Sequence, residues 1–387
     1  MYPNLYYVFK DLFGIELPAL RFINSFGFFV AIAFLVAAAL LSKELRRKAK
    51  EGLLQPTEEK VMVGQPASAG ELLVNFVLGF ILGYKIVALF LLDKELVQDP
   101  QAFIFSGQGS WPAGIALGLL FAGLKWWERR KRQLEKPQER DIRMWPHDRV
   151  GEFTVLALIF GLLGAKLFDI FENWSDFLRH PAAYILSGGG LTFYGGLICA
   201  TIAIVIYARK YKIPLRHLAD AIAPSLMIAY AIGRIGCQVA GDGDWGIVNT
   251  SPNPFGFLPD WMWSYQYPHN VIEAGVAIPG CVGRYCTQLP QPVYPTAFYE
   301  TVMGTLLFGV LWAVRKRMKL AGSLFCLYLV FNGLERFFIE KIRVNNEMDF
   351  LGFHPTQAEV IATGLVLLGL GLWLFIYTKY RAAVRKV

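Results

Sequence analysis

Long apolar runs separated by short polar segments dominate this chain of 387 residues. A helix that crosses the core of a bilayer needs about 20 consecutive apolar residues. Nine runs have roughly this length, and they predict an all-α integral membrane protein with about nine transmembrane helices. The predicted spans are residues 22–41, 71–92, 111–127, 152–171, 191–208, 218–239, 297–314, 322–339 and 357–377.

Clusters of lysine and arginine predict the orientation of these spans. If the nine spans alternate, five basic segments fall on one side of the membrane, and short basic segments are typical of the cytoplasmic side. We therefore expect the amino terminus outside, the carboxyl terminus in the cytoplasm and a small extracytoplasmic head loop. The basic segments are residues 43–50, 125–143, 209–216, 315–319 and 379–386.

Composition excludes an ordinary soluble enzyme, because 55% of the residues are hydrophobic. The net charge of +8 lies in clusters beside apolar runs rather than along one face, so we expect no nucleic-acid partner. No small-residue cleavage site precedes the first run, which we expect to be a retained helix. Cys281 and Cys286 lie in the predicted outer loop, where a disulfide and two free thiols are both open. No cysteine spacing indicates a metal site.

The chain also contains an internal repeat. Residues 70–118 match residues 151–199 at a constant offset of 81, and many of the identities are Gly, Pro and Ser, which match by chance less readily than Leu. This predicts a tandem duplication of a two-helix unit in one orientation, unlike the inverted repeats of many transporters. The predicted divisions are an outer segment at 1–21, a first helix at 22–42, a duplicated unit with a basic cytoplasmic linker at 70–150, catalytic-type helices at 151–240, the head loop at 241–296 and carboxyl-terminal helices at 297–387.

Charged residues inside the apolar spans mark the candidate site. Arg234 lies near the outer end of the sixth span, where a charge costs about 2.5–3.5 kcal/mol, so we expect it to face the protein interior and an anion or carboxylate. The alternative is an arginine that snorkels to the interface. Arg336, Glu340 and Arg343 recur at helical spacing and should share one face, with Glu340 pairing either arginine and surplus positive charge free for a phosphate. The alternative is a salt-bridge ladder without a ligand.

Three further features lie near the same predicted depth. The glycine-rich stretch 187–196 opens the fifth span, and free backbone N–H groups at a helix start suit an anion. Lys166 is a candidate for the same site, although an internal ion pair with Asp169 explains it equally well. Asp242 and Asp244 among glycines predict a tight turn rather than a calcium loop, since the later ligands of such a loop are missing. Converging cations at the outer headgroup level predict binding of phospholipid phosphate.

At these residues the sequence resembles the phosphatidylglycerol–prolipoprotein diacylglyceryl transferase family. The resemblance covers about Glu152 to the end, plus Ser-Phe-Gly at 25–27 in the first span. Four motifs carry it in order: Gly-Gly-Leu-Thr-Phe-Tyr-Gly-Gly-Leu-Ile at 189–198, Gly-Arg-Ile-Gly at 233–236 with a glycine at 246, Tyr-Pro-Thr-Ala-Phe-Tyr-Glu at 294–300 and Arg-Phe-Phe-Ile-Glu-Lys-Ile-Arg at 336–343.

The resemblance implies transfer of a diacylglyceryl group from phosphatidylglycerol to the lipobox cysteine thiol in a prolipoprotein signal peptide, with release of glycerol 1-phosphate and without a cofactor. This is the first step of lipoprotein maturation at the bacterial inner membrane, with the active site toward the outer leaflet. Tyr194, Arg234 and Arg336 are then expected to be catalytic, with Arg234 holding the lipid phosphate. The expected substrate-binding residues are Gly195, Gly196, Lys166, Gly246, Tyr294, Glu340, Arg343 and His354.

The chain departs from the family pattern at Tyr194 and Tyr294, where the family carries His, and at Cys237, where it carries Asn. The Tyr of the family's first span is Phe26. A phenol with a pKa of about 10 is a poor base, so His354 is a candidate substitute. Two alternatives therefore stay open: an inactive member that binds lipid or lipoprotein, and a phospholipid transporter, which would need charged residues at several depths.

Overall fold

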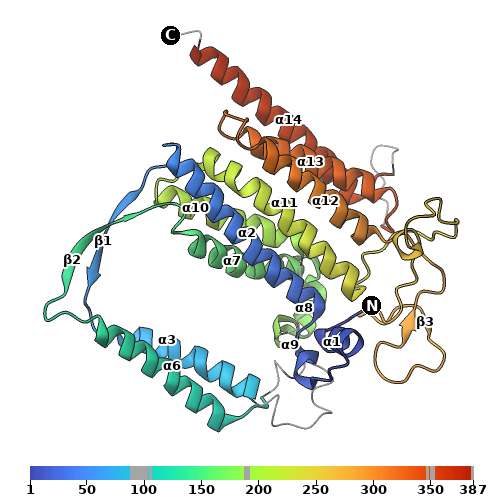
Figure 1. Cartoon of the computed structure of the whole chain (residues 1–387), viewed down its shortest axis with the longest axis horizontal. Coiled ribbons are helices and arrows are strands. Elements are labelled where there is room, and N and C mark those ends of the chain that lie inside the picture. Colours follow the sequence, from blue (N-terminus) through green and yellow to red (C-terminus); the bar gives the residue numbers. More distant parts are fainter. Residues whose placement is uncertain (88–102, 104–106, 187–191, 346–347, 349–353, 385–387) are drawn as a thin grey trace.

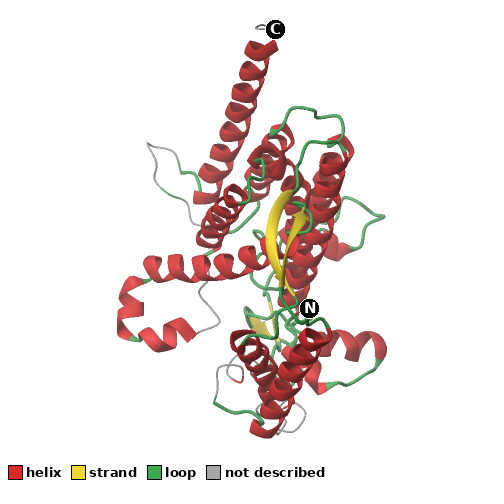
Figure 2. Cartoon of the chain, turned by 90° about the vertical axis from the view of Figure 1, so that its left-hand side faces the viewer, coloured by secondary structure: helices red, strands yellow, loops and turns green. Residues whose placement is uncertain are grey.

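Long helices make up most of the molecule (Figures 1 and 2). The structure is a computed structural model that describes the whole chain except residues 88–102, 104–106, 187–191, 346–347, 349–353 and 385–387. Its helices are α1 (Leu5–Phe13), η1 (Pro18–Phe22), α2 (Ser25–Lys50), α3 (Ala69–Leu82), η2 (Gly83–Val87), α6 (Trp111–Lys131), α7 (Val150–Glu172), α8 (Trp174–Arg179), α9 (Pro181–Leu186), α10 (Phe193–Lys210), α11 (Leu215–Ala240), η4 (Asp260–Met262), α12 (Thr296–Val314), α13 (Ser323–Glu340) and α14 (Gln357–Val384).

Helices occupy the described part of all nine predicted spans, while residues 88–92 and 191 of two spans lie outside the described residues. Six helices are long and apolar enough to cross a membrane, namely α2, α7, α10, α11, α12 and α14. Within the described residues, α3, α6 and α13 do not meet both criteria. The protein is therefore a helical, multi-pass membrane protein, and the count of nine spans stays a prediction.

Helix α11 lies at the centre of the main bundle. It packs against α2 on one side and against α12 and α13 on the other, while α13 packs against α14 and α7 against α10. Small and flexible side chains of α11 fill the interface, and Ala221, Ala223 and Met227 are fully buried. The central position explains why polar side chains on α11 point into protein rather than into lipid.

A β-ribbon, which the all-α expectation did not include, carries the amino-terminal copy of the repeat. Strands β1 (Thr57–Val63) and β2 (Gln138–Met144) pair antiparallel, with Thr57 opposite Met144 and Val63 opposite Gln138. Beyond the ribbon, α3 and α6 pack against each other, apart from the main bundle in Figure 1. We call residues 64–137 the helical arm. Arg149 fixes the base of the ribbon, since its Nη2 donates to Thr57 Oγ1 at 3.1 Å and it also pairs with Glu59.

The two helix pairs of the repeat cross at matching glycines. In the arm, Gly83 lies against Gly114, because a Cβ added to Gly83 would lie 3.0 Å from the Cα of Gly114. In the second pair, an added Cβ on Gly164 would lie 2.5 Å from the carbonyl oxygen of Gly195. Both pairs of residues are related by the offset of 81, so the two crossings have similar geometry, and the duplication stays a prediction.

The segment between α11 and α12 forms the head loop. It contains the short antiparallel pair β3 (Val276–Ala277) and β4 (Thr287–Gln288). A disulfide joins Cys281 and Cys286, which resolves the alternative that the sequence left open. Tyr267 is buried and donates to Gln238 Oε1 of α11 at 2.8 Å, so the head loop is attached to the end of α11.

Buried charged side chains lie where α2 ends and α11 begins. Lys48 Nζ is 3.6 Å from Asp220, whose carboxylate accepts hydrogen bonds from the backbone N–H groups of Gly322 at 2.8 Å and Phe325 at 3.1 Å. Gly322 directly precedes α13 and Phe325 lies in its first turn, where backbone N–H groups have no intrahelical acceptors. The contacts give this group a structural role as a helix cap rather than a place on a transport path.

Candidate active site

Arg234 lies in the last two turns of α11, and its side chain is only 17% exposed. Its Nε is 3.2 Å from Oε2 of Glu300, and its Nη1 pairs with Asp244. The arginine therefore faces the protein interior and carboxylates, as expected from the cost of a charge in an apolar span, and it does not snorkel.

Glu300, at the start of α12, is the centre of the site. Its carboxylate has no exposed surface, and besides Arg234 it is 3.2 Å from Nη1 of Arg336 and 3.5 Å from Nη1 of Arg343. Tyr230 of α11 donates to Oε1 at 3.0 Å. Sequence reasoning quoted Glu300 within a motif but gave it no role. The sequence predicted an anion or carboxylate partner for Arg234, but it did not show that Glu300, in a separate apolar span, is that partner.

Arg336 and Glu340 lie at the carboxyl-terminal end of α13 and pair with each other, as the sequence predicted. Arg336 Nη2 is 3.1 Å from Glu340, and Glu340 also accepts from Thr356 Oγ1 at 2.8 Å. The prediction that Arg343 continues the same helical face was wrong, because α13 ends at Glu340. Arg343 instead lies in a turn whose backbone pairs with Gly246 of the head loop.

Asp244 joins two of the arginines. It pairs with Arg234, and its Oδ1 is 2.5 Å from Nη2 of Arg343. The predicted tight turn is present, since Asp242 Oδ1 accepts from the backbone N–H of Asp244 at 3.3 Å and Gly243 has a positive φ. The ion pairs are an addition that the turn prediction missed. Burial alone would raise the pKa of Asp244, but Arg234 and Arg343 outweigh it and hold that pKa below its ordinary value.

The pKa of Asp242 is shifted in the opposite direction. Burial and the nearby charge of Asp244 raise its pKa above the ordinary value for aspartate. A side-chain oxygen of each aspartate and Sγ of Cys237 lie within 4.8 Å of one another. A metal ion there would meet the two guanidinium groups that pair with Asp244, so this arrangement fits ion pairs better than a cation site.

The expectation of surplus positive charge was wrong. Arg234, Arg336 and Arg343 are matched by Asp244, Glu300 and Glu340 through the ion pairs above. What the site offers a ligand is hydrogen-bond donors. Nε and Nη1 of Arg343 are buried and have no hydrogen-bond partner in the part of the chain that the structure describes. A ligand oxygen would satisfy these donors.

The motif around Tyr194 begins α10. The Tyr194 phenol is about half buried, within electrostatic reach of Arg336 and Glu340. Gly195 and Gly196 are buried against α7, and a Cβ on Gly196 would lie 2.7 Å from the carbonyl oxygen of Gly161. Close helix packing therefore requires both glycines, and their contact with substrate stays a prediction. Residues 187–191 of the glycine-rich stretch lie outside the described residues.

The other predicted residues differ in how close they lie to the arginines. Gly246 donates to the carbonyl oxygen of Tyr294 at 2.9 Å, and both are next to the turn that holds Arg343. Lys166 lies on α7 with Nζ 3.6 Å from Asp169, which is the internal ion pair that the sequence left open. His354 is exposed just before α14. Substrate roles for all four stay predictions.

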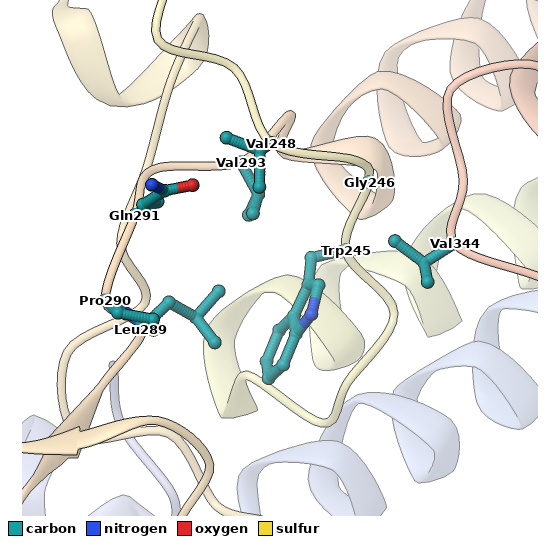
Figure 3. A pocket seen from close by; sticks show the side chains of 8 residues that line it. All are labelled: Trp245, Gly246, Val248, Leu289, Pro290, Gln291, Val293 and Val344. Carbon is teal, nitrogen blue, oxygen red and sulfur yellow. The ribbon is translucent and has the colours of Figure 1, made fainter.

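An apolar pocket of about 210 Å³ lies at the head loop, and two of its lining residues directly follow ion-paired residues in the chain. Figure 3 shows its lining side chains. Trp245 and Val344, which directly follow Asp244 and Arg343, form one wall, and Gln291 is the polar residue of the lining. The pocket thus places apolar surface beside the charged site. The remaining lining residues are Gly246, Val248, Leu289, Pro290 and Val293.

Comparisons with known proteins agree with this arrangement. Residues 109–376 match the family model described as prolipoprotein diacylglyceryl transferase. The match begins at the start of α6, so it reaches further toward the amino terminus than the motifs indicated, and it does not include residues 25–27 of the first span.

Several curated relatives carry the name phosphatidylglycerol–prolipoprotein diacylglyceryl transferase. The protein from Dehalococcoides mccartyi is 31% identical over 235 residues, which are 60% of this chain and 78% of the relative. Those from Clostridium novyi and Corynebacterium glutamicum are 30% and 27% identical, over 58% and 62% of this chain and 77% and 72% of their own lengths. The chain therefore belongs to the prolipoprotein diacylglyceryl transferase family.

Proposed function

We propose that this protein transfers the diacylglyceryl group of phosphatidylglycerol to the lipobox cysteine thiol of prolipoproteins and releases glycerol 1-phosphate, as the first step of bacterial lipoprotein maturation. Family membership supports the reaction class. The structural observation that carries the proposal is the group of three arginines around Glu300, in which the buried Nε of Arg343 has no hydrogen-bond partner in the described part of the chain.

The reaction needs such donors. The thiol gives up its proton as its sulfur attacks a glycerol carbon, and the bond between that carbon and the phosphate oxygen breaks. Glycerol phosphate leaves with the electron pair of that bond, and the thiol proton is released with it. Guanidinium groups stabilise this charge best when they are already oriented before the reaction. We propose that Arg234 and Arg343 bind the phosphate and that Arg336, oriented by Glu340, assists them. Tyr194 lies at the start of α10, where the charges of Arg336 and Glu340 act on its hydroxyl, and we propose that it contacts the reacting groups.

We further propose that the site faces the outer leaflet of the bacterial inner membrane. Arg234, Glu300 and Glu340 all lie at the end of their helices that is next to the head loop. The head loop contains the disulfide Cys281–Cys286, and disulfides persist in oxidising compartments outside the cytoplasm. The basic segments lie at the opposite ends of the helices, which supports a cytoplasmic position for them.

An assay with purified protein tests the reaction. The protein is incubated with phosphatidylglycerol vesicles and a synthetic lipobox peptide, and two products are followed: the mass gain on the peptide cysteine and free glycerol phosphate. We expect both products from the natural protein, loss of both from Arg234→Ala, and full activity from Arg132→Ala, in which an exposed arginine is removed.

Two outcomes would contradict the proposal. Retained transfer in Arg234→Ala would remove Arg234 from the mechanism. Folded protein that binds phosphatidylglycerol but yields neither product would favour a lipid-binding or lipoprotein-binding member, which the tyrosine at position 194 makes chemically reasonable because a phenol is a weak base at neutral pH.

A further inference from the structure

Glu335 is a buried carboxyl group that the proposed mechanism does not use. It precedes Arg336 on α13, and its oxygens lie 3.1 and 3.3 Å from the hydroxyl of Tyr230. The same hydroxyl lies 3.0 Å from Oε1 of Glu300. One phenol on α11 therefore connects two carboxyl groups on α12 and α13.

The number of hydrogen atoms that Glu335, Tyr230 and Glu300 can share restricts which of these groups are ionised. A phenol carries one hydrogen, and an ionised carboxylate can only accept hydrogen bonds. If both carboxyl groups were ionised, Tyr230 could donate to one of them, and the other would face the phenol oxygen without a hydrogen between them. The two short contacts are satisfied together when one carboxyl group is protonated and donates to Tyr230.

The ion pairs decide which carboxyl group holds the proton. Glu300 is paired with Arg234, Arg336 and Arg343, which all favour its ionised form. In the described part of the chain, no lysine or arginine nitrogen forms an ion pair with Glu335, and the arginine partners are Glu300, Asp244 and Glu340. If Glu335 is neutral, the positive charges of the three arginines are balanced by the negative charges of their three acidic partners, which are Glu300, Asp244 and Glu340.

We propose that Glu335 is held as a neutral carboxylic acid that donates to Tyr230, and that this hydrogen-bond chain positions Glu300 among the three arginines of the site. The charged and titratable groups around Glu335 are Tyr230 and Arg234 of α11, Glu300 of α12, and Tyr328 and Arg336 of α13. Close to Glu335, helix α14 packs against Gly333 of α13 through Ala362 and Val366, which carry no charge. Glu335 is thus a positioning residue, since it acts on the arginines through Tyr230 and Glu300.

Loss of the proton would disturb the site. Two ionised carboxylates would then face one phenol in a buried environment, and Glu300 would shift away from its position between the arginines. The activity of the natural protein should therefore fall as the pH rises and Glu335 ionises. This activity consequence rests on the proposed function, whereas the protonation state of Glu335 does not.

Infrared spectroscopy tests the protonation state without an activity measurement. The full-length protein in lipid should show the carbonyl stretching band of a protonated carboxylic acid at neutral pH, and Glu335→Gln should lack it. Tyr230→Phe should shift the band, because the acid loses its acceptor. Glu152→Gln, which removes an exposed carboxylate, should leave it unchanged. A spectrum in which Glu335→Gln removes only ionised-carboxylate bands would overturn the proposal.

The pH profile of the transferase reaction tests the positioning role. Glu335→Ala leaves a buried phenol oxygen without its donor and should lower kcat by about tenfold with little change in KM. Glu335→Gln keeps a neutral donor, so it should recover most of that loss and lack the fall in activity at high pH. A Glu335→Gln variant with the same alkaline fall as the natural protein would overturn the positioning role. If the natural protein shows no transfer, the proposed function fails, and the infrared result still decides the state of Glu335.

Discussion

Nη2 of Arg343 lies 2.5 Å from Oδ1 of Asp244, although the two residues are 99 positions apart in the chain. The contact joins the turn after α13 to the turn after α11. It is reinforced by the backbone, since Ile247 donates to the carbonyl oxygen of Ile342 at 2.8 Å. The charged site therefore depends on how two helix ends and the head loop meet.

Glu300→Gln should destabilise the protein and abolish transfer. The substitution leaves three buried or half-buried arginines without their shared carboxylate, and breaking a buried ion pair in this way costs about 3–5 kcal/mol. Thermal unfolding in detergent and the transfer assay measure the two effects. The matched control is Glu273→Gln, which removes an exposed carboxylate of the head loop and should be neutral in both measurements. Equal stability of the two variants would contradict the central position of Glu300.

Asp242→Asn should stabilise the protein at neutral pH and lose this advantage in acid. The pKa of Asp242 is raised in the folded protein, first by burial and then by Asp244. A group with a raised pKa contributes stability below its unfolded pKa, near 3.8, and this contribution is lost as the pH rises through the folded pKa. Above its folded pKa the natural protein therefore lacks this contribution, whereas the uncharged Asn carries no such penalty. Melting curves of both proteins between pH 7.5 and pH 4 should converge toward the acid end, and a gap independent of pH would show that the shift is absent.

Gly164→Ala and Gly161→Ala should have opposite effects although they lie one turn apart on α7. A Cβ on Gly164 would lie 2.5 Å from both Cys199 Cβ and the carbonyl oxygen of Gly195, so α7 and α10 would have to separate, at a cost of about 1–3 kcal/mol. A Cβ on Gly161 meets no atom within 4 Å, and alanine favours helix over glycine by about 1 kcal/mol. Thermal unfolding of the two variants checks the close crossing, and similar melting temperatures would contradict it.

Removal of the helical arm should leave the main bundle folded and active. Replacing residues 64–137 by Asn-Gly joins Val63 directly to Gln138, its partner across the ribbon, through a two-residue hairpin turn. The arm helices pack against each other, and the ring contact of Phe103 with Phe22, at 5.5 Å, is one link to the rest that the deletion removes. Expression, melting temperature and transfer activity should stay close to those of the full chain. Loss of transfer from a folded deletion variant would show that the arm contributes to the reaction.

Cys281 and Cys286 should react with a membrane-impermeant maleimide only after reduction, and from the outside of the cytoplasmic membrane. The disulfide protects both thiols, and the head loop is proposed to face outward. Spheroplasts treated with and without a mild reductant, followed by peptide mass analysis, give the result. The double variant Cys281→Ser, Cys286→Ser serves as the control without reactive head-loop thiols. Labelling without reductant would contradict the disulfide, and labelling only after lysis would contradict the orientation.

The sequence by itself determined the helical membrane class and the approximate places of the helices. Apolar runs of bilayer length report directly on lipid exposure, and this property is local in the chain. The cost of a charge in such a run also singled out Arg234 and Arg336, and glycines at a fixed offset predicted the repeat. The β-ribbon escaped this reasoning because β1 and β2 are polar and because the strands pair across the long intervening segment 64–137.

Only the tertiary structure decided which charges from remote segments meet. Helical spacing related Arg343 to Glu340 along one face, but α13 stops at Glu340, and Arg343 turns to Asp244 and Glu300 instead. The helix end depends on the backbone pairing with Gly246, which no local pattern encodes. Glu300 and Glu335 likewise read as two acidic residues in separate apolar runs until α11 places Tyr230 between them. Ion pairs and shared protons depend on distances of a few ångströms between remote segments, and only the packing of the helices determines those distances.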